Sequence, residues 1–368
     1  MINRRIYSNF LQLKVVIPVI SIIISSILLL LSFKYQWIGG KFIAIVIIST
    51  AIFWIISLIW SERKIKYIFI IPTTILLIVI TIIPFIYLLS LSVHDVTALN
   101  FNKEWNFIGL KNYIFKDTGV LIHLILTIEF ILFAVVLEFI IGMGLALLLN
   151  REFVGKKIVF PLLLIPIMTT PVVVGMMWKY MFAATSGLVN QILKFMRLPG
   201  IPWLSNHPLP FVSNIPIIGA WLVKNLNLNY GFLAVIITDV WQWTPFMFLV
   251  LLAGLSSIPS EPYEAAAVDG ANYWQTFRYI TLPLMQNIIL ISVLLRIMDA
   301  MKVFDTIWAL FGNTILMRPL NMYIFNVGIN MRQYSIGAAA SILVLILVSV
   351  ISAFFVKVIY SKYSNKRK

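Results

Sequence analysis

The sequence has no cysteine and only three histidines among its 368 residues. Without cysteine there can be no disulfide framework and no thiol chemistry. His94, His123 and His207 are far apart in the sequence, and no zinc-ligand spacing connects them. We therefore expect no metal site and no cofactor in this chain.

The sequence motifs of common soluble enzymes are also missing. There is no G-x-x-x-x-G-K-[ST] phosphate-binding loop and no H-E-x-x-H motif, so we expect neither ATP binding of that kind nor catalysis. Charged residues make up 11% of the chain and hydrophobic residues 61%, a balance that is typical of membrane helices. Basic loops on the cytoplasmic side of a membrane explain the net charge of +15 better than nucleic-acid binding does.

Long apolar runs fill most of the chain. A helix needs about 20 apolar residues to cross the hydrocarbon core of a bilayer, and about eight runs approach or exceed that length. The sequence therefore predicts an all-α integral membrane protein with about eight transmembrane helices. The runs are Val15–Phe33, Phe42–Trp60, Tyr67–Val93, Leu121–Leu149, Ile158–Phe182, Phe232–Leu255, Leu284–Phe311 and Ile336–Val356.

The first run follows basic residues, as a signal sequence does, but it has no small-residue cleavage site and another run follows it. We interpret it as an uncleaved anchor. Lysine and arginine are denser in the loops on the side of the N-terminus, which places both termini in the cytoplasm. Residues 1–66 then form two additional N-terminal transmembrane helices. Residues 67–368 form the main body, with a cytoplasmic loop at 256–283 and an outer loop at 183–231.

Proline marks two segments. It is frequent in the outer loop 183–231, which excludes a continuous helix there. The apolar piece Ile215–Val223 of that loop is too short to span a membrane. The loop is either a passive connection or a docking surface for an outer partner. In the fifth run, Pro161, Pro166 and Pro171 predict a kinked helix, which suits a moving part and a merely bent one equally.

Several charged residues fall inside apolar runs, where each costs about 3 kcal/mol at mid-depth, so such residues usually face the interior of a helix bundle. Glu129 and Glu138 lie on the fourth run. On the seventh run, opposite charges recur every three residues and can partly neutralise one another. They form either an ion ladder that packs helices or the wall of a polar pathway. These residues are Arg296, Asp299, Lys302 and Asp305.

The sixth run carries a mixed polar and aromatic face. Its members are spaced at i, i+3, i+4 and i+7, which places them on one side of a helix. Flat rings and amide or carboxylate groups together suit a sugar, although the rings could equally pack against lipid or other helices. The residues are Asp239, Gln242, Trp243 and Phe246.

The segment Glu264–Pro283, EAAAVDGANYWQTFRYITLP, is a polar stretch between two apolar runs. It resembles the EAA-x3-G-x9-I-x-LP loop of permease subunits of binding-protein-dependent ABC importers. Further segments are similar to the carbohydrate branch of that family, the maltose-type and glycerol-phosphate-type permeases. They are FIGLKNY, GLVNQIL, WQWTPFMFLVLLAGLSSIP and KVFDTIWAL. One departure is FGNTILMRP after Leu310, where the branch has a glycine-rich turn.

The resemblance implies that this segment is the coupling helix that docks on an ATPase subunit. Alanines give a slim helix face for a groove, and Glu264 offers a carboxylate to an arginine of the partner. Gly270 permits a tight turn between two helix pieces, and Pro283 suits the first turn of the next membrane helix. The coupling residues are Glu264, Ala265, Ala266, Asp269, Gly270, Ile280, Leu282 and Pro283.

The resemblance also implies partners and a pathway. The expected partners are a second homologous permease subunit, two ATP-binding cassette subunits that hold ATP and magnesium, an extracytoplasmic substrate-binding protein and membrane lipid. The expected location is the cytoplasmic membrane of a bacterium or archaeon. The helices that flank the coupling segment line the substrate pathway in this family, at positions that match Asp239, Gln242, Trp243, Phe246, Arg296, Asp299, Ala300 and Val303.

Two questions of function stay open at this point. The aromatic and amide face favours a neutral sugar or oligosaccharide, whereas Arg296 and basic outer segments could favour glycerol phosphate or a sugar phosphate. The intramembrane charges could also belong to an ion-coupled secondary transporter, which would work without an ATPase partner.

Overall fold

The computed structural model describes residues 65–114, 119–213, 215, 226–312 and 318–365. The two N-terminal helices predicted within residues 1–66 lie outside the described residues. Of that range, the structure describes only residues 65 and 66. Most of the segment Ile215–Val223 and of the departing turn after Leu310 also lies outside them. The chain divides into two compact units, Met1–Tyr87 and Leu88–Lys368, and the functional residues considered below belong to the second unit.

The described part of the chain is helical, as the sequence predicts. Among the residues that the structure describes, five helices are long and apolar enough to cross a membrane, and six spans result if one sharply bent pair counts as one. Strand structure in the described ranges is limited to one antiparallel pair, β1 (His94–Asp95) with β2 (Asn106–Phe107). The long helices are α3 (Ile65–Val93), α4 (Val120–Leu149), α10 (Tyr230–Ser256), the run Tyr273–Ala300 and α16 (Tyr334–Asn365).

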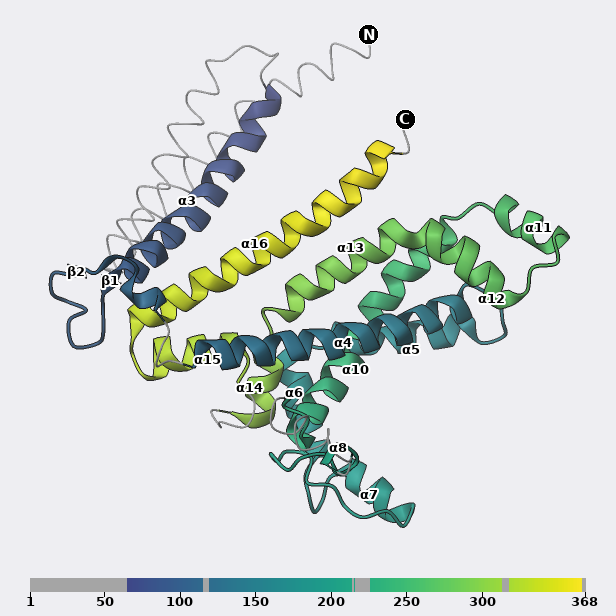
Figure 1. The fold of residues 1–368 in the computed structure, drawn as a ribbon, viewed down its shortest axis with the longest axis horizontal. Helices are drawn as coiled ribbons and strands as arrows, with labels where there is room; N and C mark the ends of the chain where they lie inside the picture. Colours follow the sequence, from purple (N-terminus) through teal and green to yellow (C-terminus); the bar gives the residue numbers. More distant parts are fainter. Residues whose placement is uncertain (1–64, 115–118, 214, 216–225, 313–317, 366–368) are drawn as a thin grey trace, which may run out of the picture. The chain divides into compact units, whose positions relative to one another are not determined.

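The bent pair replaces the single kinked helix predicted for Ile158–Phe182. Helix α5 (Lys156–Met168) and helix α6 (Pro171–Met181) meet at an angle of 100° (Figure 1). Thr169 and Thr170 between them have extended backbone angles. The cause is Pro171, because its ring disfavours the helical conformation of the residue before it and it has no N–H to donate.

The seventh predicted run, Leu284–Phe311, is also divided. Helix α13 (Leu282–Ala300) ends eleven residues before Phe311, and a separate helix α14 (Asp305–Phe311) follows. Phe304 interrupts the helix with φ −149° and ψ −60°. Asp305 therefore begins a different helix and does not continue the predicted ladder of charges.

The core of the second unit forms where α10 packs against α4, α5 and α13. Gly142 allows the close approach of α4 to α10, because a Cβ at that position would lie 3.0 Å from the Met247 side chain. Phe130, Phe248 and Leu251 are fully buried in this core. Helix α10 thus holds its polar face, including Asp239, inside protein.

The segment 183–231, predicted to be an outer loop, has no continuous helix in its described residues, as its prolines predict. Before α10 begins, those described residues contain α7 (Leu188–Phe195) and the short α8 (Pro210–Ser213). Asn190 fastens the loop, since its amide group donates to the carbonyls of Ala184 and Ile201, both at 3.0 Å, and accepts from the Trp203 indole at 3.1 Å.

The remaining described elements are short. They are η2 (Gly109–Tyr113), α11 (Glu261–Val268), α12 (Tyr273–Thr276), the π-helical turns η3 (Phe277–Thr281) and η4 (Asn326–Asn330), and α15 (Leu320–Phe325).

Candidate functional site

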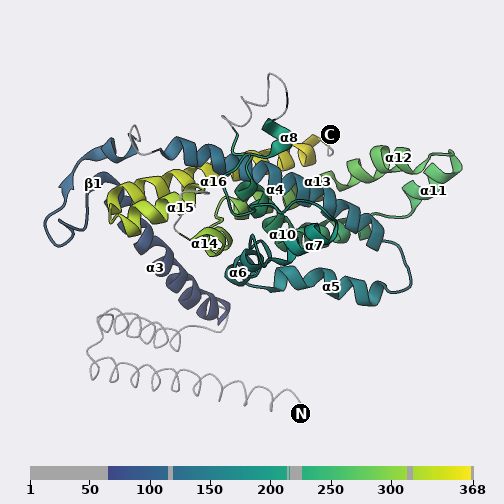
Figure 2. The same ribbon diagram turned by 90° about the horizontal axis from the view of Figure 1, so that it is seen from below.

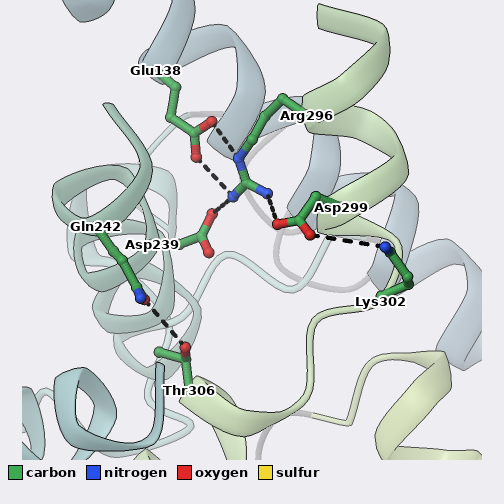
Figure 3. A network of polar contacts seen from close by, with 7 residues as sticks. All are labelled: Glu138, Asp239, Gln242, Arg296, Asp299, Lys302 and Thr306. Atoms are coloured by element: carbon green, nitrogen blue, oxygen red, sulfur yellow. Dashed lines mark hydrogen bonds and ion pairs between the residues drawn. The ribbon is translucent and has the colours of Figure 1, made fainter. Parts of the chain in front are cut away.

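The guanidinium of Arg296 lies at the centre of a polar network between helices (Figure 3). It is bound by Glu138 through two parallel hydrogen bonds, Nε to Oε2 at 2.7 Å and Nη2 to Oε1 at 2.9 Å. Both side chains are buried, with exposed fractions of 1% for Arg296 and 0% for Glu138. Parallel bonds of this kind are the strongest that an arginine makes with a carboxylate.

Two further carboxylates complete the shell of Arg296. Its Nη2 also donates to Asp239 of α10, and its Nη1 donates to Asp299 at 3.3 Å. We call the four residues Glu138, Asp239, Arg296 and Asp299 the Arg296 junction. It joins α4, α10 and α13. It reaches the surface at Asp299, whose side chain is 44% exposed, and there Asp299 lies 4.0 Å from the ammonium group of Lys302.

Burial makes this junction sensitive to the loss of any member. An ion taken from water into protein loses several kcal/mol of solvation, which is recovered only when partners and hydrogen bonds are present. Arg296 has three such partners, the hydrogen-bonded carboxylates of Glu138, Asp239 and Asp299. The arrangement therefore fixes the relative positions of three helices as long as all partners are in place.

Trp243 packs against the guanidinium of the Arg296 junction. Its ring centroid lies 5.0 Å from the guanidinium carbon of Arg296, which is a cation–π contact. Trp243, Phe246 and Val303 are half-buried, so part of each side chain remains accessible, whereas Ala300 is buried. Accessible aromatic and polar side chains thus lie next to a rigid charged support.

Gln242 shares a helix face with Asp239, but its hydrogen bonds go to other residues than those of the junction. Its amide nitrogen donates to the Thr169 carbonyl at 3.2 Å, and its amide oxygen lies 3.5 Å from the Thr306 hydroxyl (Figure 3). Gln242 is 2% exposed. It connects α10 to the break between α5 and α6 and to α14, and it is not part of the Arg296 junction.

Sequence reasoning did not assign Glu138 to the site. The signal was present, because Glu138 is a carboxylate inside an apolar run and such a group needs a partner. The sequence does not say which helix faces α4, so the pairing with Arg296 could not be derived. The structure brings Asp239, Trp243, Arg296 and Asp299 together, with Lys302 at the exposed end.

The predicted coupling segment begins within α11 and turns at Gly270, whose φ of +72° is in the left-handed region that favours glycine. The Gly270 N–H donates to the Ala267 carbonyl at 3.2 Å, and the Ala271 N–H donates to the Ala266 carbonyl at 2.9 Å. These two bonds form a Schellman motif, which ends the helix without leaving its last carbonyls unpaired. Among the coupling residues on this side, Ala266 is buried, whereas Glu264, Ala265, Asp269 and Gly270 are exposed.

The helix after the turn begins earlier than predicted. Asn272 and Gln275 form a capping box, and the helical run from Tyr273 continues through η3 and α13 to Ala300. Pro283 therefore does not begin this helix. It lies in the first turn after the π-helical turn, where the wider spacing accommodates a residue that cannot donate an N–H. Ile280 and Leu282 are half-buried, and Pro283 is exposed.

Metal binding has no evident support in this region. Within the described ranges, no group of three or more histidine, aspartate or glutamate side chains is arranged to hold a metal ion.

Comparison with known proteins places these features in a family. Residues 138–365 match the model of the binding-protein-dependent transport system inner membrane component. The chain is 33% identical over 309 residues to the trehalose/maltose transport system permease protein MalF of Thermococcus litoralis, covering 81% of this chain and 95% of that protein. It is 30% identical over 299 residues to the trehalose transport system permease protein SugA of Mycobacterium tuberculosis, covering 81% and 89%.

A similar fold occurs in a solved structure. A chain of a bacterial alginate ABC transporter, solved in complex with an alginate pentasaccharide-bound periplasmic protein, superposes with a TM-score of 0.64 at 22% identity. The match covers 80% of this chain and 93% of that one. The family model covers well over half of the present sequence, beginning at the junction residue Glu138. The chain therefore belongs to the family of binding-protein-dependent transport system inner membrane components.

Proposed function

We propose that this chain is the transmembrane subunit of an ATP-driven importer for a sugar or oligosaccharide. As a permease it is a transport subunit of the cell membrane and not an enzyme. In the proposal it forms part of the translocation pathway and is coupled to separate ATPase subunits through Glu264–Pro283. The names of its relatives, which include trehalose and maltose permeases, support the carbohydrate class.

The ion pair between Asp239 and Arg296 is the observation that carries the proposal. These residues lie on α10 and α13, the two membrane helices that flank the coupling segment. The helical run from Tyr273 to Ala300 is unbroken, and at 1.5 Å per residue it reaches from the coupling segment to Arg296 over about 35 Å. A displacement of the segment would therefore reach the junction and the Trp243 ring beside it.

The environment of Arg296 favours a neutral sugar over a sugar phosphate. A phosphate needs a cation with free donors, but Glu138, Asp239 and Asp299 already surround this guanidinium. Trp243 can offer a flat ring to the apolar face of a sugar. We propose that Trp243, Phe246, Asp299 and Val303 contact the substrate. Asp239, Gln242, Arg296 and Ala300 then shape the pathway from behind.

The proposal includes the partners that such an importer requires. They are a second homologous permease subunit, two ATP-binding cassette subunits that hold ATP and magnesium, an extracytoplasmic binding protein and membrane lipid. The similar solved structure of an alginate ABC transporter in complex with a periplasmic protein supports the extracytoplasmic binding protein as a partner. The outer loop 183–231 is the proposed docking surface for it.

The direct test uses the complete complex in liposomes. The chain, its partner permease and the ATPase subunits are reconstituted, and ATP hydrolysis is measured with binding protein loaded with trehalose, maltose or glycerol phosphate. We expect one of the sugars to stimulate hydrolysis and to enter the liposomes. Stimulation by glycerol phosphate alone would contradict the neutral-sugar assignment. Uptake driven by a proton or sodium gradient without any ATPase would refute the importer itself.

A further inference from the structure

A cavity of about 230 Å³ lies at the foot of the coupling segment. It is enclosed by the end of α4, the end of α10, α11 and the beginning of the Tyr273–Ala300 run. Figures 1 and 2 both show α11 and α12 at the end of the second unit where α4 stops and α5 begins. The cavity therefore lies between the coupling segment and the ends of α4 and α10.

Arg151 provides a free positive charge at this cavity. Its guanidinium carbon lies 5.5 Å from the centroid of the Tyr273 ring, and both residues line the cavity. A guanidinium stacked on a ring keeps the N–H donors at its edge available. In the described part of the chain, Arg151 has no ion pair and its side chain has no hydrogen-bond acceptor.

Other hydrogen-bonding groups line the same space. In the described part of the chain, the Asn150 side chain makes one hydrogen bond, in which its amide oxygen accepts from the Ser256 hydroxyl at 3.5 Å, so its amide N–H₂ group remains available. The Tyr263 hydroxyl lies 3.3 Å from the Thr281 hydroxyl. The described residues that line the cavity include no aspartate or glutamate. The donors and the charge thus favour an anion.

We propose that this cavity binds the phosphate group of an anionic membrane lipid. The volume is below the roughly 300 to 1,000 Å³ that a drug-sized ligand needs, so it suits one small group. Arginine matches phosphate oxygens with its fork of donors. Anionic lipids are abundant at the cytoplasmic surface, where the coupling segment is expected to lie. The other wall is apolar and suits the beginning of the lipid chains. It consists of Leu147, Leu255 and Phe277.

A bound phosphate would restrain the coupling segment. It would connect Arg151, just after α4, with Tyr263 on α11. The Tyr263 hydroxyl is also hydrogen-bonded to Thr281 in the Tyr273–Ala300 run. This regulatory consequence rests on the proposed coupling function, whereas lipid binding itself does not. Lipid content therefore adjusts coupling through a site within the permease.

The test counts lipid bound to the complete importer complex by native mass spectrometry after exchange into phosphatidylglycerol. Arg151→Gln is compared with Lys157→Gln, because Lys157 is a nearby basic residue in the first turn of α5 that does not line the cavity. We expect Arg151→Gln to weaken phosphatidylglycerol retention by about tenfold or more, as for loss of one charge-assisted contact, and Lys157→Gln to retain it. Equal retention in both variants overturns the proposal.

Further arms separate the other occupants. In phosphatidylcholine with added inorganic phosphate, Arg151-dependent protection from thermal unfolding without phosphatidylglycerol retention would identify soluble phosphate and reject a lipid. Weaker ATPase assembly with unchanged lipid retention would identify a protein contact instead. If Arg151→Gln does not assemble, Asn150→Asp places a negative charge at the same wall and should reduce retention. Because retention is measured without transport, its loss is distinguishable from failure of the proposed function.

Discussion

Glu138 of α4 and Arg296 of α13 are joined by two parallel hydrogen bonds of 2.7 and 2.9 Å in a fully buried position. The two residues are 158 positions apart in the sequence. Arg296 also binds Asp239 and Asp299, so one guanidinium connects three helices. The pair therefore stabilises the packing on which the proposed pathway depends.

The first prediction concerns the order of stability losses at this junction. Arg296→Met should lower the free energy of unfolding by about 3 to 5 kcal/mol, because it leaves Glu138 and Asp239 buried without a cation. Glu138→Gln should cost less, about 1 to 3 kcal/mol, because Arg296 keeps two carboxylates. The measurement is the midpoint of thermal unfolding of the detergent-solubilised complex.

Glu152→Gln provides the control for this series. Glu152 also pairs with a basic residue, Lys156 at 2.7 Å, but its side chain is 90% exposed. Exposed pairs contribute about 0 to 1 kcal/mol, so the midpoint should hardly change. A midpoint for Arg296→Met equal to that of Glu152→Gln would show that the junction does not stabilise the fold.

Among the predicted runs that lie in the described residues, four correspond to single helices, α3, α4, α10 and α16, because the length of an apolar run is a direct consequence of bilayer thickness. Two other runs are divided by backbone effects that run length does not reveal. Pro171 turns Thr169 and Thr170 out of the helix, which divides the fifth run. In the seventh run, the helix α13 ends at Ala300, although the apolar run continues to Phe311.

The site was predictable in part for a similar reason. A spacing of three or four residues places side chains on one face of a helix, and this identified Asp239 and Trp243. Contacts between helices have no such local rule. The sequence showed that Glu138 needed a partner but not that Arg296 was that partner. It also placed Gln242 with Asp239, whereas its hydrogen bonds lead to Thr169 and Thr306.

The second prediction tests coupling. Glu264→Lys should reduce ATP-driven uptake by tenfold or more while the protein still inserts, because the exposed carboxylate would no longer bind an arginine of the ATPase subunit. Glu261→Lys is the matched control. Both glutamates lie in the first turn of α11, so both changes remove the same favourable interaction with the helix dipole. Similar uptake in the two variants would argue against a specific coupling role for Glu264.

The third prediction concerns the turn at Gly270. A Cβ there would meet no atom within 4 Å, so the only obstacle to alanine is the φ of +72°, which costs about 1 to 2 kcal/mol. Gly270→Ala should loosen the end of α11 and increase hydrogen exchange at its amides, with reduced uptake. Gly270→Asn should be milder, because asparagine tolerates this conformation.

Gly144→Ala is the control for the turn. A Cβ at Gly144 also meets no atom within 4 Å, but Gly144 is within α4 and has no positive φ. Alanine should be neutral or slightly stabilising there. If Gly144→Ala and Gly270→Ala changed exchange in α11 equally, the left-handed turn would not be the cause.

The last prediction uses an asymmetric contact between two glycines. A Cβ at Gly337 of α16 would lie 2.8 Å from the Gly328 Cα, whereas a Cβ at Gly328 of η4 would lie 3.6 Å from the Gly337 Cα. The first distance requires the backbone to move and the second is an ordinary contact. Gly337→Ala should therefore lower the free energy of unfolding by about 1 to 3 kcal/mol, as overpacking does, and Gly328→Ala should be tolerated. The measurement is the midpoint of thermal unfolding of the two variants. Equal midpoints would mean that α16 and η4 do not pack this closely in the membrane.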